Sequence, residues 1–266
     1  MNRHRFGELE VLACAPEGEA HPVPLLFVHG AYTAAWCWQE HFMPWFAEAG
    51  FSCYAVSLSG HGHSRRRDGL DSYSLNDYVN DVAEVVGGLP AAPALIGHSM
   101  GGMVVQKYLE RTEAPAAVLM ASVPPQGLWT SALGLMFRKP MLLQDLNRLL
   151  GGGEAHAATL RDALFYQPVA DEDMRRYLSL SQPESHRAIW DMTLFNLPLP
   201  SRMARVPMLI LGAEHDELIP PSLVRMTSSV YGLREEIFPG MGHAMMLERD
   251  WESVAERMRA WLQSVL

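Results

Sequence analysis

The chain has 266 residues, of which 48% are hydrophobic and 19% charged, and its formal net charge is −9 at pH 7. This composition is that of an ordinary globular protein with one large domain or two small ones. The negative charge argues against nucleic acid as a partner, because phosphate binding needs clustered Lys and Arg. The three cysteines lack a C-x-x-C spacing, and no apolar stretch is long enough for a signal-peptide core or a membrane span, so we expect a cytoplasmic protein.

Short apolar runs alternate along the chain with longer amphipathic segments. A first antiparallel hairpin is expected over residues 5–13, and later runs that predict strands lie at 24–30, 52–58, 94–99, 116–122, 207–213 and 235–240. Several runs are apolar at consecutive positions, as in parallel strands covered on both faces. The last segment, 251–266, repeats apolar residues at helical spacing. The pattern predicts an α/β fold with a mostly parallel central sheet and helices on both faces.

The stretch from 125 to 203 interrupts this alternation. It has no clear strand pattern, carries helical patterns such as "PMLLQDLNRLL" at 140–150 and "DEDMRRYLSLS", and has a flexible break at 151–155. A structureless loop of that length is improbable inside a compact domain. We therefore expect residues 1–124 and 204–266 to form the core domain and residues 125–203 to form a helical insertion between two strands.

The motif G-x-S-x-G occurs at Gly97, Ser99 and Gly101, where an apolar run ends and a helical pattern begins. In this motif the strand turns sharply into the helix with the serine at the apex, and the small flanking residues allow close packing. This position predicts a nucleophile. The alternative role for Ser99 is a helix N-cap, which serine also favours.

A serine nucleophile needs a base that takes its proton and an acid that orients the base. The loop "EHDELIPP" after one predicted strand supplies Asp216, and "MGHAMMLE" after the next supplies His243. The order serine, acid, histidine is the one that this strand–turn–helix arrangement requires. Glu214 and Glu217 compete with Asp216 as the acid. The alternatives are a turn-forming aspartate for Asp216 and an exposed loop histidine for His243.

Acyl transfer also needs backbone N–H donors for the oxyanion that forms. Met100 supplies one donor beside Ser99 at the start of the predicted helix, and the turn His29-Gly30-Ala31 supplies a second from Ala31. We expect His29 to be a buried histidine that binds backbone and holds this loop, and not a catalytic base.

These motifs together resemble the α/β-hydrolase fold superfamily over nearly the whole chain. The matching segments are "HGA", "SLSGHGHS", "GHSMGG", "HDELIP" and "GMGHAMMLE". The resemblance implies that residues 125–203 form a helical cap over the active site, and that neither a metal nor an organic cofactor takes part. It implies these roles: Ser99 as nucleophile, His243 as general base and then acid, Asp216 as its orienting acid, and Ala31 and Met100 as oxyanion donors.

Differences from the patterns of known subfamilies reduce the number of reactions that fit this sequence. Ser99 stands at the turn between strand and helix where haloalkane dehalogenases and epoxide hydrolases carry aspartate, so these two subfamilies are disfavoured. The run "HGAYTAAWCW" is similar to plant hydroxynitrile lyases and methyl esterases, but Ala244 replaces the lysine of the lyases and the tryptophan of many carbon–carbon bond hydrolases. We expect a serine hydrolase of carboxylic esters, or of a related thioester or lactone. The alternatives are non-hydrolytic chemistry (lyase-like, carbon–carbon hydrolase, or perhydrolase and haloperoxidase-like) and a ligand-binding receptor.

The predicted pocket is apolar and deformable, which suits a small uncharged ester. Its predicted lining residues are Trp36, Met103, Phe165 and Trp190, with Met136 and Phe137 as further cap residues. The alternative for each is a place in the core of the cap or of the domain. We expect His61 and His63 to be loop residues near the rim, and the protein to be a monomer or a homodimer.

Overall fold

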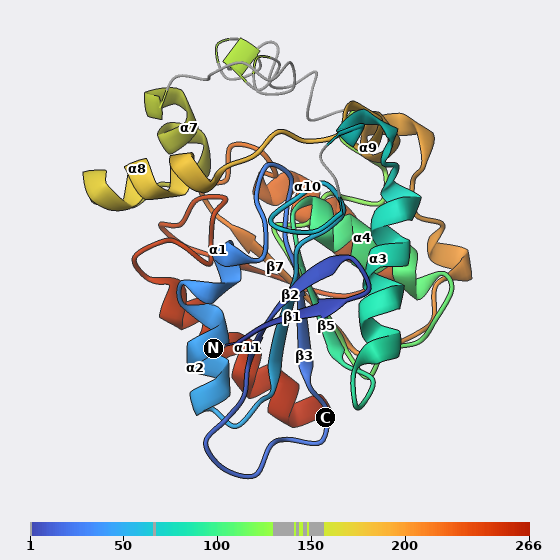
Figure 1. The fold of residues 1–266 in the computed structure, drawn as a ribbon. Coiled ribbons are helices and arrows are strands. Elements are labelled where there is room, and N and C mark those ends of the chain that lie inside the picture. The colour runs from blue at the N-terminus through green and yellow to red at the C-terminus, as the bar shows by residue number, and fades with distance from the viewer. Residues whose placement is uncertain (1, 66–67, 130–140, 142–143, 146–147, 149–156) are drawn as a thin grey trace.

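The structure, a computed structural model, describes residues 2–65, 68–129, 141, 144–145, 148 and 157–266. Its centre is an eight-stranded sheet in the order β1-β2-β4-β3-β5-β6-β7-β8 (Figure 1). Met136, Phe137 and the predicted break lie outside the described residues, and so does most of the predicted helix at 140–150.

The sheet is mostly parallel. The expected hairpin is present, since β1 pairs antiparallel with β2 and β2 pairs antiparallel with β4, while all other neighbours run parallel. The strands are β1 (Asn2–Phe6), β2 (Leu9–Cys14), β3 (Leu25–Val28), β4 (Cys53–Val56), β5 (Ala94–His98), β6 (Ala117–Met120), β7 (Met208–Ala213) and β8 (Glu235–Phe238). The predicted fold class is therefore confirmed.

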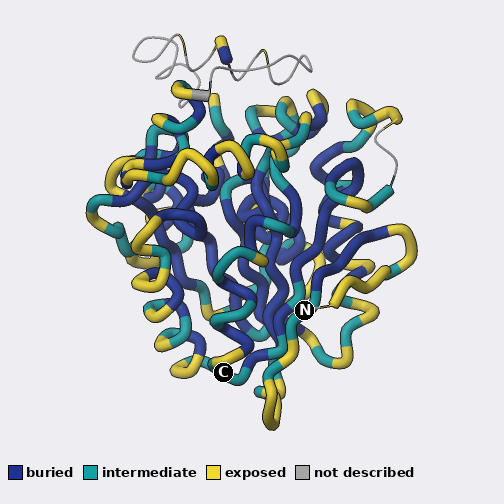
Figure 2. The backbone as a smooth tube through the Cα atoms, turned by 60° about the vertical axis from the view of Figure 1, so that its left-hand side comes forward, coloured by how far each residue is buried: buried dark blue, intermediate teal, exposed yellow. Residues whose placement is uncertain are grey.

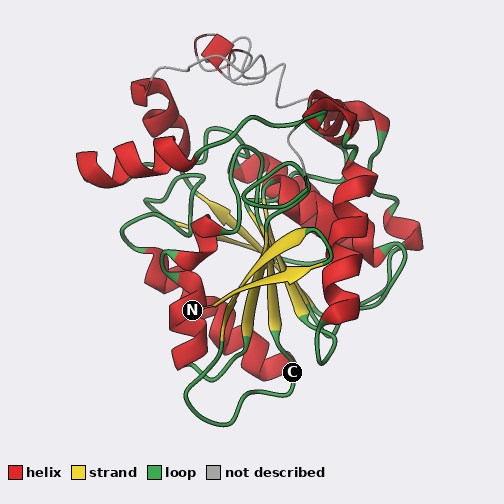
Figure 3. Ribbon diagram, viewed as in Figure 1, coloured by secondary structure: helices red, strands yellow, loops and turns green. Residues whose placement is uncertain are grey.

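Helices cover both faces of this sheet, as the red and yellow elements of Figure 3 show. One face carries α1 (Trp36–Gln39), α2 (Phe42–Glu48) and α11 (Trp251–Val265). The other face carries α3 (Leu75–Gly88), α4 (Met100–Leu109) and α10 (Pro221–Tyr231), and a short 3-10 turn, η1 (Leu70–Ser72), precedes α3.

The central strands are apolar at nearly every position, because successive side chains point to opposite faces and helices cover both faces of the sheet. In β3, Leu25 and Phe27 pack with the α2 and α11 face, whereas Leu26 and Val28 pack with the α3 and α4 face. All four are fully buried. Figure 2 shows the same distribution, with the sheet buried at the centre and exposed backbone on the surrounding loops and helices.

The regular elements described between β6 and β7 are all helices or helical turns. It contains α7 (Ala157–Leu164), α8 (Asp171–Leu180), α9 (His186–Trp190), the π-helical turn η2 (Asp191–Phe195) and the 3-10 turn η3 (Pro200–Arg202). Within the described part of 125–203 there is no strand. The backbone N–H of Gln182 donates to Tyr32 after β3, and that of Ala244 after β8 donates to Leu164, so this segment contacts loops at the carboxyl edge of the sheet. Its division from the core as a separate cap stays a prediction. No helix in the described ranges could cross a membrane.

Candidate active site

The turn between β5 and α4 has the geometry of a nucleophile elbow. Ser99 has φ 54° and ψ −119°, a strained backbone conformation for a residue with a side chain. A Cβ added to Gly97 would lie 2.4 Å from the Gly101 carbonyl oxygen, and one added to Gly101 would lie 2.3 Å from that of Val28. Only glycine therefore fits at either flank. The Ser99 side chain is partly exposed and makes no capping hydrogen bond to the helix, so the N-cap alternative does not account for it.

Asp216 and His243 form a buried acid–histidine pair. The Nδ1–H of His243 donates to Asp216 Oδ2 at 2.7 Å, and both side chains are almost fully buried. The other oxygen, Oδ1, accepts the backbone N–H groups of Leu218 and Ile219 at 2.8 and 2.7 Å. Asp216 is thus both a turn-forming aspartate and the partner of the histidine. With Nδ1 donating, Nε2 of His243 is the ring nitrogen free to accept a proton.

Glu214, a competing acid in the sequence, has a different contact. Its carboxylate accepts the backbone N–H of Gly240 at 2.9 Å and lies beside His215. His215 in turn stacks on Tyr166, with ring centroids 3.6 Å apart. The geometry therefore favours Asp216 as the acid.

His98, which the sequence reasoning did not single out, joins the elbow to the histidine loop. Its Nε2–H donates to the backbone carbonyl of His243 at 3.0 Å, and the two rings are 4.7 Å apart. Burial holds the pKa of His98 well below its ordinary value, so the ring is neutral. Because His98 directly precedes Ser99, this contact brings the loop of His243 to the elbow.

Glu248 holds the other side of the histidine loop. Its buried carboxylate accepts the backbone N–H groups of Gly242 and Tyr166 at 2.7 Å each and that of Gln167 at 3.1 Å. Burial raises the pKa of Glu248, and these three donors oppose the rise. A single acidic residue at the end of the apolar run "HAMMLE" was the available sequence signal for this role.

The loop after β3 approaches Ser99 closely. A Cβ on Gly30 would lie 3.1 Å from that of Ser99, so only glycine fits without displacement. The Gly30 carbonyl accepts from His29 Nδ1–H at 2.7 Å and from the Thr33 hydroxyl at 3.1 Å. The carbonyl and the N–H of one trans peptide point in opposite directions, so these two donors fix the direction of the Ala31 N–H.

His29 has the backbone-binding position that we expected. It is fully buried, and its Nε2 accepts the N–H of Leu58 at 3.0 Å. Burial, together with the charge of the neighbouring His61, lowers the pKa of His29 to about 3. The ring is therefore neutral and cannot serve as a base that gains a proton near neutral pH.

The expectation that His61 lies near the rim is wrong. His61 is fully buried, and its Nε2 lies 3.2 Å from the Glu184 carboxylate, which is also fully buried. The partner comes from the segment between α8 and α9, so the contact could not be foreseen from the motif "SGHGHS" alone. His63 is exposed.

The four predicted lining residues have different environments. Trp36 is half-buried and stacks on Tyr177 of α8, with ring centroids 5.7 Å apart. Phe165 stacks on the same Tyr177 ring, with centroids 6.1 Å apart. Met103 is fully buried in the α3 and α4 core, as its alternative predicted, whereas Trp190 is 56% exposed beside Phe195. A role in substrate binding stays a prediction for all four.

Among the described residues no group of three or more His, Cys, Asp or Glu is placed to hold a metal ion.

Known proteins resemble this chain in sequence and in fold. It is 26% identical over 261 residues to a protein of Bacillus subtilis (strain 168) named "Uncharacterized carboxylesterase nap", covering 92% of this chain and 80% of that one. It is 25% identical over 241 residues to a non-heme chloroperoxidase of Burkholderia pyrrocinia, covering 84% and 86%. The solved esterase EaEST of Exiguobacterium antarcticum superposes with a TM-score of 0.75 at 20% identity over 96% and 95% of the two chains, which shows a shared fold.

Residues 25–257 match the sequence profile of the Alpha/beta hydrolase family. The match spans both the elbow at Ser99 and the pair of Asp216 and His243, and the sheet order and the elbow geometry agree with it. The chain belongs to the alpha/beta hydrolase family.

Proposed function

We propose that the chain is a serine hydrolase that cleaves small carboxylic esters, or a related thioester or lactone, through an acyl-enzyme on Ser99. The observation that carries the proposal is the buried 2.7 Å contact between His243 Nδ1 and Asp216 Oδ2, on a loop that His98 ties to the strained elbow. An acid that fixes the histidine tautomer, next to a partly exposed serine, is the arrangement that activates a hydroxyl.

In the proposed reaction the Ser99 hydroxyl oxygen attacks the acyl carbon while its proton passes to His243 Nε2. The carbonyl oxygen becomes an oxyanion, which the N–H groups of Ala31 and Met100 bind, a contribution of about 3 to 4 kcal/mol per donor. His243 then gives its proton to the leaving alcohol, and the ester bond breaks. Water repeats the sequence on the acyl-enzyme and frees the acid. Asp216 stays ionised and stabilises the histidine cation.

We further propose that residues 125–203 act as a cap that shapes the substrate site. The aromatic stack of Trp36, Tyr177 and Phe165 supports this, since it joins α8 to the helix that follows the Ala31 loop. Such a surface suits an uncharged acyl or aromatic ester.

Cys14, Cys37 and Cys53 are free thiols, which supports a reducing, cytoplasmic setting. A monomer or a homodimer stays our expectation.

Perhydrolase chemistry is the second candidate, because a non-heme chloroperoxidase is among the relatives. The same acyl-enzyme would react with hydrogen peroxide in place of water and release a peracid. Ala244, which stands where lyases carry lysine, disfavours the lyase alternative. The receptor alternative predicts a serine that does not react, which the experiment below tests.

The proposal is tested by the intact mass of the protein after brief exposure to a fluorophosphonate, for wild type, Ser99→Ala and the control Ser72→Ala. Ser72 is an exposed serine at the end of η1, and its hydroxyl donates to the backbone carbonyl of Gly69, the residue before η1. We expect one adduct in wild type and in the control and none in Ser99→Ala, with turnover of p-nitrophenyl esters lost in parallel. Labelling that persists in Ser99→Ala, or no labelling of wild type, would refute the proposal. Peracid formation from acetate and hydrogen peroxide distinguishes the second candidate.

A further inference from the structure

The segment 182–185, between α8 and α9, touches the loop that carries the Ala31 N–H. The backbone N–H of Gln182 donates to the Tyr32 carbonyl at 2.8 Å, and its side-chain oxygen accepts the N–H of Gly62 at 2.8 Å. Tyr32 has φ 64°, in the left-handed region that disfavours a bulky residue. Such a conformation persists only where neighbouring contacts enforce it, and the bond from Gln182 is one of them.

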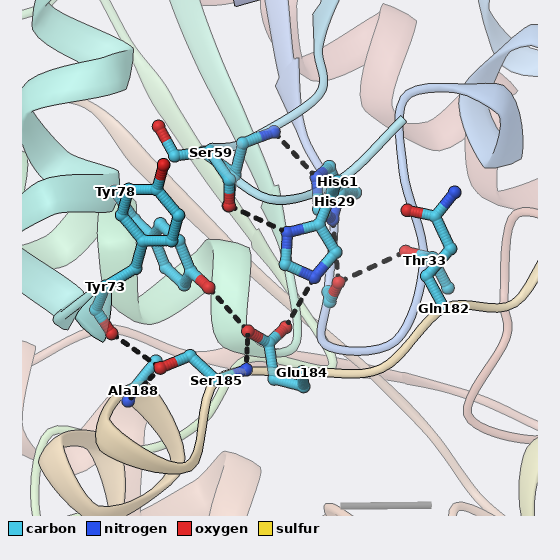
Figure 4. Close-up of polar contacts among 12 residues, drawn as sticks. His29, Thr33, Ser59, His61, Tyr73, Tyr78, Gln182, Glu184, Ser185 and Ala188 are labelled. Atoms are coloured by element: carbon cyan, nitrogen blue, oxygen red, sulfur yellow. Dashed lines mark hydrogen bonds and ion pairs between the residues drawn. The ribbon is translucent and has the colours of Figure 1, made fainter. Parts of the chain in front are cut away.

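A buried ion pair anchors the same segment. Glu184 Oε2 lies 3.2 Å from His61 Nε2, while Oε1 accepts the Tyr78 hydroxyl at 2.6 Å and the Ser185 N–H at 2.8 Å (Figure 4). Burial raises the pKa of Glu184, but the charge of His61 and these hydrogen bonds outweigh it and hold the pKa below its ordinary value. On its other side His61 Nδ1 faces the Ser59 carbonyl at 3.2 Å. Both ring nitrogens therefore face acceptor oxygens, and this arrangement favours the doubly protonated, cationic ring.

The His61 cation lies next to His29, with ring centroids 5.2 Å apart. A second cation at this distance in the interior would be strongly repelled, so His29 stays neutral beside a charged His61. With Nε2 accepting from Leu58, the neutral ring must carry its proton on Nδ1, where it donates to Gly30. This bond fixes the peptide that contains the Ala31 N–H.

We propose that Gln182 and Glu184 are positioning residues for oxyanion binding: through Tyr32, and through His61 and His29, they hold the Gly30–Ala31 peptide in its donor orientation. This inference rests on the proposed function. It gives the segment between α8 and α9 a part in the rate of acyl transfer, in addition to any part in binding the substrate.

The variants Glu184→Gln and Gln182→Ala test the inference. Glu184→Gln keeps an acceptor for Tyr78 and removes the charge that pairs with His61. Gln182→Ala keeps the backbone N–H that donates to Tyr32 but removes the side-chain acceptor of the Gly62 N–H, which anchors that backbone against the loop. The matched control is Asp191→Asn, because Asp191 also joins this part of the chain to the core, by accepting the Leu75 N–H at 3.0 Å, at the start of α3.

For each variant we would measure kcat and KM on a p-nitrophenyl ester and, by mass spectrometry, deuterium exchange of the peptide that contains residues 29–33. Losing a whole oxyanion donor lowers kcat by about 10²- to 10³-fold. A misdirected one should lower it by about tenfold in Glu184→Gln, with KM within about threefold of wild type. Both variants should exchange faster over 29–33, and Asp191→Asn should match wild type in both readouts.

A raised KM with unchanged kcat, or wild-type exchange over 29–33 in both variants, would overturn the inference. If Glu184→Gln does not fold, Gln182→Ala decides by the same two readouts. If wild-type protein neither labels at Ser99 nor cleaves esters, the proposed function fails, and the exchange measurement still decides whether segment 182–185 orders the loop.

Discussion

The contacts of Asp216 make a sharp prediction for its replacement by asparagine. Oδ1 accepts two backbone N–H groups, from Leu218 and Ile219, so the amide oxygen of Asp216→Asn must take that position. The amide NH₂ then faces His243 Nδ1, where the carboxylate accepted a proton at 2.7 Å. Two buried donors cannot face each other without a cost of about 1 to 3 kcal/mol. The histidine therefore moves its proton to Nε2, the nitrogen that must accept the proton of Ser99.

The wrong tautomer should lower kcat by about 10⁴-fold, which corresponds to about 5.4 kcal/mol of transition-state stabilisation. Asp216→Ala fixes neither tautomer, so we expect Asp216→Asn to be at least as slow as Asp216→Ala. The assay is ester turnover at a temperature where thermal unfolding shows both variants to be folded, with Glu214→Gln as the control that keeps kcat within about twofold. The reasoning is refuted if Asp216→Asn is faster than Asp216→Ala, or if ¹⁵N NMR finds its His243 proton still on Nδ1.

Three further predictions follow from the same region. Ser99→Gly should unfold at a higher temperature than Ser99→Ala, by about 1 kcal/mol in stability, because glycine relieves the strain at φ 54°; equal melting temperatures would contradict this strain. Gly101→Ala should lose about 1 to 3 kcal/mol in denaturant titrations, or fail to fold, because its Cβ would lie 2.3 Å from the Val28 carbonyl oxygen; wild-type stability would show that the close approach is not rigid. The pKa of His29 is lowered from 6.5 to about 3. Between these values the unfolded chain binds the extra proton, so stability falls as the pH falls, by about 1.4 kcal/mol per pH unit from this group. His29→Gln should remove that share of the pH dependence in unfolding titrations between pH 4 and 6.5, and an unchanged slope would contradict a neutral His29.

Much of the fold could be predicted because its signals are local. An apolar run such as residues 94–98 predicts a buried strand by itself, and the glycines at Gly97 and Gly101 mark the turn that follows. The pairing of Asp216 with His243 was also within reach, since each residue follows a strand and the chain order selects them. Their contact in the structure agrees with that reasoning.

The contacts that the sequence did not reveal join distant segments through single polar residues. His61 was expected at the rim, because a histidine in a glycine-rich loop carries no sign of a buried partner, and Glu184 is an isolated acid in a polar stretch. Met103 lies at a helical position that serves a pocket or a core equally well, and the structure buries it in the core. Periodicity identifies which face of an element is apolar, but not which distant residue covers it.

The described part of residues 125–203 contacts the rest of the chain at two places, each beside a residue to which we assign a catalytic role. At its α7 end, Leu164 accepts the N–H of Ala244, and Glu248 binds Tyr166 and Gln167 beside the histidine loop. Between α8 and α9, Glu184 forms an ion pair with His61, whose ring lies beside His29 in the loop that precedes Ala31. Replacing this segment with that of a relative, as in a chimeric enzyme, would therefore also remove contacts that hold the loops of His243 and Ala31. The donor sequence would need to supply matching partners for Glu248 and His61, because these two residues belong to the rest of the chain and would keep their side of each contact.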